Sequence, residues 1–328
     1  MHKWLLAVLL LFSLTGMAED KQHFQLGVFA YRPVELMQER FQPLVDYLNE
    51  QLEGSQIHLQ ILDLPELTQA VEEGRLDLVL TNPSHYNLLR HHYALQGPLV
   101  TLVNLEQGIP TRALGGVILV DPAAGISELS QLRHQRVAVP GTYFLGGYQT
   151  QVYELMQLDI HPQQDFEVEE LGSHDAVITA LLQGKYVAGF VRTGVLESKL
   201  RQGELKPGQL QVLNPQQYAG FPFQVSTRLY PEWPLASIGE CACTRELVRA
   251  LLNLAPDHPA VLALGIDGFS PPADYSVMDR LAFALKLPPY NQSKPVSLLD
   301  LWRDQPLLIL IVGSLLIFTL GFLLALML

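Results

Sequence analysis

The sequence predicts an α/β protein of two lobes, the second inserted into the first. Strand-like and helix-like patterns alternate in two successive series, which is typical of doubly wound α/β layers. The residues between two hydrophobic ends, 19–305, are too many for one small domain and suit two lobes. The N-terminal hydrophobic end indicates that these lobes are translocated.

The N-terminus has the layout of a secretory signal. His2 and Lys3 form a short basic region, residues 4–14 are almost wholly apolar, and residues 16–18 suit cleavage. The apolar stretch is short for a bilayer span, which favours cleavage near Ala18 over an uncleaved anchor. We therefore expect a signal peptide over residues 1–18, and translocation under either alternative.

The C-terminus predicts a membrane anchor. Residues 306–328 carry no charge, and a helix of that length reaches about 34 Å at about 1.5 Å per residue, enough to span a bilayer with some tilt. Trp302 and Arg303 lie where interfacial residues belong. No basic residues follow the span, which indicates either a larger protein cut at this point or a tail-anchored subunit with a separate partner.

The first series follows the signal. Residues 24–30, 57–62 and 76–80 read as strands, and residues 34–52 and 64–73 read as helices between them. The last strand is short and fully apolar, as in a buried parallel sheet.

The second series begins near Gly115 and Gly116. Its predicted strands are 117–120, 136–139, 166–170 and 187–191, and its predicted helices are 146–158, 174–183 and 194–201. The chain would cross between lobes near 114–116 and again near 214–221, and a largely helical tail would run over 244–287. The first lobe thus comprises 24–114 and 221–287, the second 115–213, with a Pro-rich linker over 288–305.

Composition excludes some partners. The formal net charge is −12, or −13 once Lys3 is removed with the signal, which argues against nucleic acid and anionic lipid surfaces but not against a small anion. Cys241 and Cys243 do not make a disulfide framework. A bridge across one residue would be strained, and both a bridge and a free thiol pair stay open; metal binding needs more ligands.

Ligands of open α/β sheets sit beyond the carboxyl ends of the strands, at helix N-termini. Four places have that arrangement. In the first, residues 81–86, Asn82 is a natural helix cap and Pro83 fits the first helical position, so the N–H groups of Ser84 and His85 would face the crevice beside Thr81 and Tyr86. The alternative is an ordinary capped helix.

The other three places lie in the second lobe. Residues 141–148 include Gly146 and Gly147, which permit close backbone approach to a ligand. In residues 172–175, Ser173 can cap a helix, and His174 either contacts a ligand or is solvated. In residues 191–194, Arg192 ends a buried strand and either grips an oxyanion or pairs with Glu197 or Asp175.

The sequence offers no catalytic set. It has no nucleophile elbow, no zinc-protease helix motif, no phosphate-binding P-loop and no convincing Cys–His pair. We therefore expect no enzyme in this chain, no cofactor and no metal.

In this order, the four places resemble the phosphate/phosphite/phosphonate-binding periplasmic protein family. The chain is most similar to the subgroup that forms periplasmic sensor regions of membrane histidine kinases, including tetrathionate sensors. The resemblance covers residues 26–290 and rests on LDLVLTNPSHY (76–86), GGVILV (115–120), LGGYQTQVYEL (145–155), GSHDAVITALLQGKYVAGFVRTGVLE (172–197), FPFQVSTRLYPEWPLA (221–236) and DGFSPPADYSVMDRL (267–281).

The resemblance implies a type II binding-protein fold that closes on a small anion. Carried over by position, the cleft residues would be Tyr31, Thr81, Asn82, Tyr86, Gly146, Gly147, His174, Arg192, Thr193, Ser226 and Thr227. One departure matters: phosphonate transporters have a run of hydroxyl residues before the second-lobe helix, where this chain has Thr142, Tyr143, Phe144 and Leu145. A sulfur oxyanion such as tetrathionate, or a larger partly apolar anion, therefore fits better than a phosphonate.

The predicted function is a periplasmic sensor domain that captures an oxyanion of sulfur or phosphorus. Closure would pass through the linker to an inner-membrane helix and a signalling partner, as the input part of a two-component sensor kinase. The predicted transmembrane helix after the binding domain favours this reading. The alternative is the substrate-binding subunit of a phosphonate- or phosphite-type ABC transporter, and an enzyme on the same fold is a third class without a nucleophile–base pair to support it.

Overall fold

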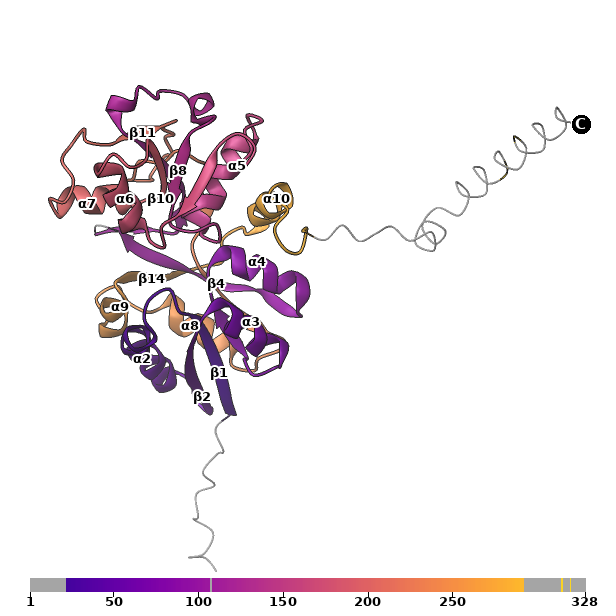
Figure 1. Cartoon of the computed structure of the whole chain (residues 1–328). Coiled ribbons are helices and arrows are strands. Elements are labelled where there is room, and N and C mark those ends of the chain that lie inside the picture. Colours follow the sequence, from indigo (N-terminus) through magenta and orange to yellow (C-terminus); the bar gives the residue numbers. More distant parts are fainter. Residues whose placement is uncertain (1–21, 107, 292–313, 315–318, 320–328) are drawn as a thin grey trace, which may run out of the picture. The chain divides into compact units, whose positions relative to one another are not determined.

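Two β-sheets with helices packed on their faces organise the chain (Figure 1). The computed structural model describes residues 22–106 and 108–291 together with Ser314 and Thr319. Within these residues no helix is both long enough and apolar enough to cross a bilayer. The predicted signal peptide, 1–18, lies outside the described residues. So does the predicted membrane helix, 306–328, except Ser314 and Thr319, which are helical and exposed.

The first sheet mixes parallel and antiparallel strands. Its strands are β1 (Gln22–Phe29), β2 (Ser55–Leu62), β3 (Leu78–Leu80), β4 (Leu95–Glu106), β5 (Ile109–Thr111), β13 (Pro234–Ile238) and β14 (Ile266–Ser270). They run in the order β14-β4-β13-β3-β1-β2, with β5 paired to β4. β1 is parallel to both β2 and β3, whereas β13 and β14 pair antiparallel with their neighbours. The prediction of a doubly wound sheet holds for the parallel half. The tail over 244–287 is largely helical, as predicted, but it also contributes β14 to this sheet.

Alternating side chains of β3 supply the two faces of this sheet. Leu78 and Leu80 pack against α2 (Val34–Gln51), α8 (Thr244–Leu252) and α9 (Pro259–Leu264). Val79 faces the opposite layer of α3 (Leu64–Glu72), α4 (Pro83–His92) and α10 (Ser276–Ala284). This period-two alternation between two apolar layers explains why the strand reads as fully hydrophobic.

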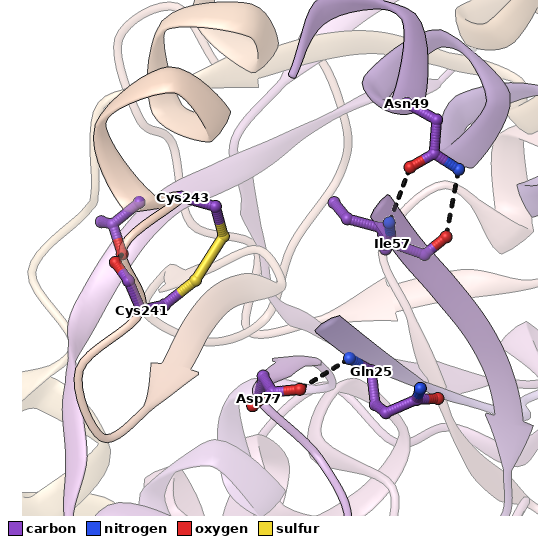
Figure 2. The surroundings of a disulfide bond; sticks show 7 residues. Gln25, Asn49, Ile57, Asp77, Cys241 and Cys243 are labelled. Atoms are coloured by element: carbon purple, nitrogen blue, oxygen red, sulfur yellow. Dashed lines mark hydrogen bonds between the residues drawn. A yellow bond between two sulfur atoms is a disulfide. The ribbon is translucent and has the colours of Figure 1, made fainter. Parts of the chain in front are cut away.

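Hydrogen bonds from side chains to the backbone fix the positions of β1, β2 and β3, and a disulfide lies nearby (Figure 2). Asn49 on α2 donates to the Ile57 carbonyl at 3.1 Å and accepts its N–H at 2.6 Å, which fixes the entry to β2. Asp77 accepts the N–H of Gln25 at 2.7 Å and ties β3 to β1. Cys241 and Cys243, left open between a bridge and free thiols, form a disulfide with Cα atoms 5.3 Å apart, between β13 and α8.

The second sheet is built from residues between the two crossings. It contains β7 (Gly116–Val120), β8 (Arg136–Val139), β9 (Glu167–Glu170), β10 (Ala188–Arg192) and β11 (Gln211–Leu213), in the order β11-β7-β10-β8-β9. One face packs on α5 (Thr150–Met156) and the other on α6 (His174–Leu182) and α7 (Val195–Arg201). β8 is parallel to β9 and β10, while β7 is antiparallel to β10 and β11.

The two crossing segments pair with each other. β6 (Ala113–Leu114) leads into the second sheet, and β12 (Tyr230–Pro231) pairs antiparallel with it where the chain returns. The crossover is therefore a two-stranded ribbon. It places the carboxyl ends of β3 and β10, with the segments that follow them, near the junction of the two sheets.

Helix α10 is the last described helix before the C-terminal segment, and it contacts both halves of the fold (Figure 1). Its Met278 and Leu281 share one buried cluster with Leu145 and Tyr153, which follow β8 in the second sheet. Asp279 bonds to Arg90 and His91 of α4 at 2.5 and 2.7 Å.

Candidate functional site

The start of α4 has the capped geometry that its sequence predicts. Asn82 accepts the His85 N–H at 2.9 Å, and Pro83 occupies the first turn. Because this N–H is already bonded, it is not available to a ligand. The Ser84 hydroxyl instead reaches the other half of the fold and donates to Gln149 at 2.7 Å.

His85 is a neutral structural histidine. Thr68 donates its hydroxyl hydrogen to the Leu64 carbonyl, so Nε2–H of His85 donates to Thr68 and Nδ1 accepts from Thr81, both at 2.9 Å. Burial lowers the pKa of His85 to about 4. Thr81, which was predicted to bind the ligand, is fully buried, and its hydroxyl hydrogen is directed at His85.

The two predicted tyrosines occupy different environments. Tyr86 is 2% exposed and packs edge-on against Tyr275 in the core, 5.3 Å between ring centroids. Tyr31 is 47% exposed and lies edge-on to the half-buried Trp233, at 5.4 Å. Tyr31 can therefore touch a ligand from the surface, whereas Tyr86 supports α4 from beneath.

Opposite Ser84 lies a π-helical turn, η3 (Leu145–Gln149), whose Gln149 accepts a hydrogen bond from the Ser84 hydroxyl. A Cβ on Gly146 would stand 2.8 Å from Cβ of Arg192, and one on Gly147 would stand 2.8 Å from Cε1 of His174. Any side chain at either position would push these residues away. The paired glycines therefore bring the turn against Arg192 and His174.

His174 begins α6 and keeps one unsatisfied nitrogen. Ser173 caps this helix by accepting the Ala176 N–H at 3.1 Å. The His174 ring lies edge-on to Phe144, and its buried Nδ1 has no hydrogen-bond partner among the described residues. Burial, followed by the charge of Arg192, lowers the pKa of His174 to about 4, so the ring is neutral at physiological pH.

Arg192 is held by two carboxylates. Its guanidinium lies 2.8 Å from Glu106, at the end of β4, and 3.4 Å from Glu232, which follows β12. The partners predicted for a structural ion pair, Glu197 and Asp175, are wrong: Asp175 pairs with Lys199, and Glu197 accepts the backbone N–H of Gln224. The chain reversal after β4 was not apparent in the sequence, so Glu106 could not be placed beside β10.

Three predicted hydroxyl residues bind the crossover backbone. Thr193 accepts the Gly115 N–H at 3.2 Å, and Thr227 accepts the Gly116 N–H at 2.9 Å. Ser226 accepts the Ile118 N–H at 2.8 Å and donates to the Leu213 carbonyl at 2.7 Å. All three are buried. Ser226 and Thr227 fasten the returning segment to β7, and Thr193 fastens the end of β10 to Gly115, directly before β7.

The contacts join these residues in two series. One runs from Ser84 through Gln149, Tyr143 and Phe144 to His174. In the other, Arg192 contacts Glu232, and the next residue, Trp233, contacts Tyr31. Sequence reasoning missed Gln149, Glu106 and Glu232 as members of the site. Gln149 and Glu232 lie in the quoted strings LGGYQTQVYEL and FPFQVSTRLYPEWPLA, but the direction of their side chains cannot be read from a string.

The sequence of this chain matches a known family. The profile described as ABC transporter, phosphonate, periplasmic substrate-binding protein matches residues 26–276. The tetrathionate sensor histidine kinase of Salmonella typhimurium is 28% identical over 234 residues, covering 70% of this chain and 39% of the kinase. This chain therefore spans well under half the length of that relative.

Solved structures share the fold. A Xanthomonas citri protein bound to ATP superposes with a TM-score of 0.65 at 18% identity, covering 81% of this chain and 98% of that protein. PhnD1 from Prochlorococcus marinus, in complex with methylphosphonate, gives a TM-score of 0.58 at 16% identity, with the same coverage of both chains.

Proposed function

Because this chain belongs to the phosphonate-binding family of periplasmic substrate-binding proteins, we propose that it is a periplasmic sensor domain for a small oxyanion of sulfur or phosphorus. The resemblance predicted from the motifs is confirmed, both for the family and for the similarity to a tetrathionate sensor kinase. The proposal places the chain at the input of a two-component sensor kinase anchored in the inner membrane, with the predicted span over 306–328.

The position of α10 is the observation that carries the sensor reading. On one side, Asp279 bonds to Arg90 of α4, the helix whose first turn reaches Gln149. On the other, Met278 and Leu281 pack with Tyr153 of α5. A change in the angle between the two sheets must alter at least one of these interfaces, because packed interfaces do not deform continuously.

Signalling needs only that the anion prefers one arrangement of the lobes. The helix that would report the arrangement, α10, directly precedes the linker, 288–305, and the predicted membrane helix. In a transporter subunit the same closure would instead be presented to a permease. The similarity to a sensor kinase favours the sensor over that alternative.

The polar groups of these residues suit an anion. His174 offers an unsatisfied neutral nitrogen at the start of α6, and Gly146 and Gly147 bring the backbone of η3 close. Tyr31 and Trp233 provide apolar area for a ligand larger than phosphate. Among the predicted ligand residues, Tyr31, Asn82, Gly146, Gly147, His174 and Arg192 are therefore the proposed contacts, and the buried hydroxyl groups are proposed to act on the scaffold.

Calorimetric titration of the full chain in nanodiscs tests binding. The probes are tetrathionate, thiosulfate, methylphosphonate and phosphite, with uncharged glucose as the control. At least one oxyanion should bind with Kd of about micromolar or tighter. Absence of binding by all four would refute the proposed function.

Hydrogen exchange then tests the sensor reading. The oxyanion that binds should change exchange protection in residues 276–287, where α10 bridges the two halves. Binding that leaves this segment unchanged would contradict signalling through α10 while leaving anion capture intact.

A further inference from the structure

The Arg192 guanidinium already holds an anion in this structure, and that anion belongs to the protein. Glu106 places a carboxylate oxygen 2.8 Å from Nη2 of Arg192, and its other oxygen lies against Gly194. Asn104 donates to the same Glu106 oxygen at 3.0 Å. An external oxyanion that binds Arg192 through paired N–H groups competes with this carboxylate.

The two carboxylates on Arg192 differ in their freedom to move. The Glu232 side chain is 3% exposed, and its backbone lies in the crossover, where its N–H donates to Arg112 and its carbonyl accepts from Tyr275. The Glu106 side chain is 25% exposed at the end of β4. Moving Glu106 into water therefore costs less than moving Glu232.

The charges of Arg192, Glu106 and Glu232 support the conclusion that Glu106 is the carboxylate that leaves. Burial raises the pKa of Glu232, because a carboxylate charge is poorly solvated there. With Glu232 neutral, Arg192 and Glu106 form a balanced pair, and with Glu232 ionised the cluster carries an excess negative charge. With Glu232 neutral, which its burial favours, an arriving anion meets no unbalanced positive charge until Glu106 leaves.

We propose that Glu106 is a displaceable internal occupant of the anion site, which must leave Arg192 before an external oxyanion can bind there. The inference rests on the proposed function and adds a rule for which anions can bind. A dianion such as tetrathionate can replace the Glu106 carboxylate on the guanidinium. A monoanion such as methanesulfonate gains too little electrostatic attraction to displace it. Glu106 is thus a positioning residue that acts on ligand choice through Arg192.

The decisive variant is Glu106→Gln, titrated by calorimetry as the full chain against tetrathionate, methylphosphonate and methanesulfonate. Removing the competing charge should tighten binding by about tenfold or more, since a hydrogen bond to a charged group is lost from the unliganded state. Methanesulfonate should gain most, so discrimination between dianion and monoanion should shrink. A merely structural role of Glu106 would weaken binding instead.

Matched variants control the result. Glu169→Gln removes the same charge from an exposed Arg136–Glu169 pair of the second sheet and should leave all affinities unchanged. Glu106→Asp keeps the charge and should retain discrimination. With Arg192→Gln in place, Glu106→Gln should have no further effect on affinity, because the two residues act as one unit.

The outcomes separate the two claims. If wild type binds a dianion and Glu106→Gln binds it no tighter, the gating inference is overturned and the proposed function stands. If neither wild type nor Glu106→Gln binds any of the three probes, and wild type binds neither thiosulfate nor phosphite, both are overturned. If Glu106→Gln tightens binding equally in the Arg192→Gln background, Glu106 acts by general electrostatics and the inference through Arg192 fails.

Discussion

The crossover and the start of α6 both carry polar side chains that the family motifs place in the cleft, but their hydrogen-bonding capacity is used differently. At the crossover, Ser226 and Thr227 each accept one backbone N–H and donate to one carbonyl. At α6, Nδ1 of His174 is buried without a partner among the described residues. Polar residue types alone therefore do not identify a binding site.

Substitutions at the crossover and substitutions near α6 should therefore have different effects on stability and on anion binding. Crossover residues should affect the free energy of unfolding and leave the affinity for an anion largely intact. Residues at α6 and η3 should do the reverse. The predictions that follow test this separation, beginning with the largest effect.

Ser226→Ala should lower the free energy of unfolding by about 2–6 kcal/mol. The substitution leaves the buried Ile118 N–H and Leu213 carbonyl unpaired, and each unpaired group costs about 1–3 kcal/mol. Denaturant unfolding followed by circular dichroism measures the loss. A folded variant with unchanged stability and weakened anion binding would place Ser226 in the ligand site instead.

Acid should destabilise the protein through its buried histidines. The pKa of His85 is about 4 when folded and near 6.5 when unfolded, so unfolding takes up a proton between these values. Its contribution is complete above pH 6.5 and is lost as pH falls towards 4, by about 3 kcal/mol. Unfolding of wild type and His85→Gln at pH 7.5 and 4.5 should show a smaller acid loss in the variant.

An exposed histidine provides the control for this acid effect. His92→Gln should lose stability with acid as wild type does, because His92 lies at the exposed end of α4. Equal acid sensitivity in wild type and His85→Gln would contradict the assignment of His85 as a buried neutral residue.

His174→Leu should weaken anion binding by about tenfold, or about 1.4 kcal/mol, without lowering the free energy of unfolding. The variant removes the unpaired Nδ1, so folding loses no hydrogen bond, whereas the ligand loses a contact. Calorimetry measures the affinity, and denaturant unfolding of the same preparation measures the stability. Wild-type affinity in this variant would move the site away from α6.

Ser84→Ala should have the smallest effect, a loss of about 1 kcal/mol in affinity. The hydroxyl donates to Gln149 across the two halves, which favours the arrangement in which α4 and η3 meet. Gln149→Ala should cause a similar loss, and the double variant should lose no more than either single one. Additive losses would show that the two residues act separately.

Local patterns predicted the parallel part of the fold well. β1, α2, β2 and α3 lie where hydrophobic periodicity and capping residues placed them. β4 and β14 escaped prediction for a physical reason. β4 contains Gly97 and Pro98, and β14 contains Gly268; these residues interrupt the strand pattern, and pairing with each other stabilises both strands.

The candidate site was predictable in its backbone but not in its side chains. The cap at Asn82 and the glycine pair followed from local chemistry. The π-helical turn replaced the first part of the helix expected over 146–158, which altered the direction of Gln149. The partners of Arg192 come from segments distant in sequence, and no spacing rule relates Glu106 to position 192.

The most direct test of the sensor account is a distance measurement between spin labels on the two lobes. Glu39→Cys on α2 and Thr179→Cys on α6 place labels at exposed positions, and the disulfide keeps Cys241 and Cys243 from reacting. Saturating tetrathionate, or methylphosphonate if that is the anion that binds, should shorten and narrow the distance distribution. Tight binding with an unchanged distribution would contradict the claim that this domain senses an anion by closing.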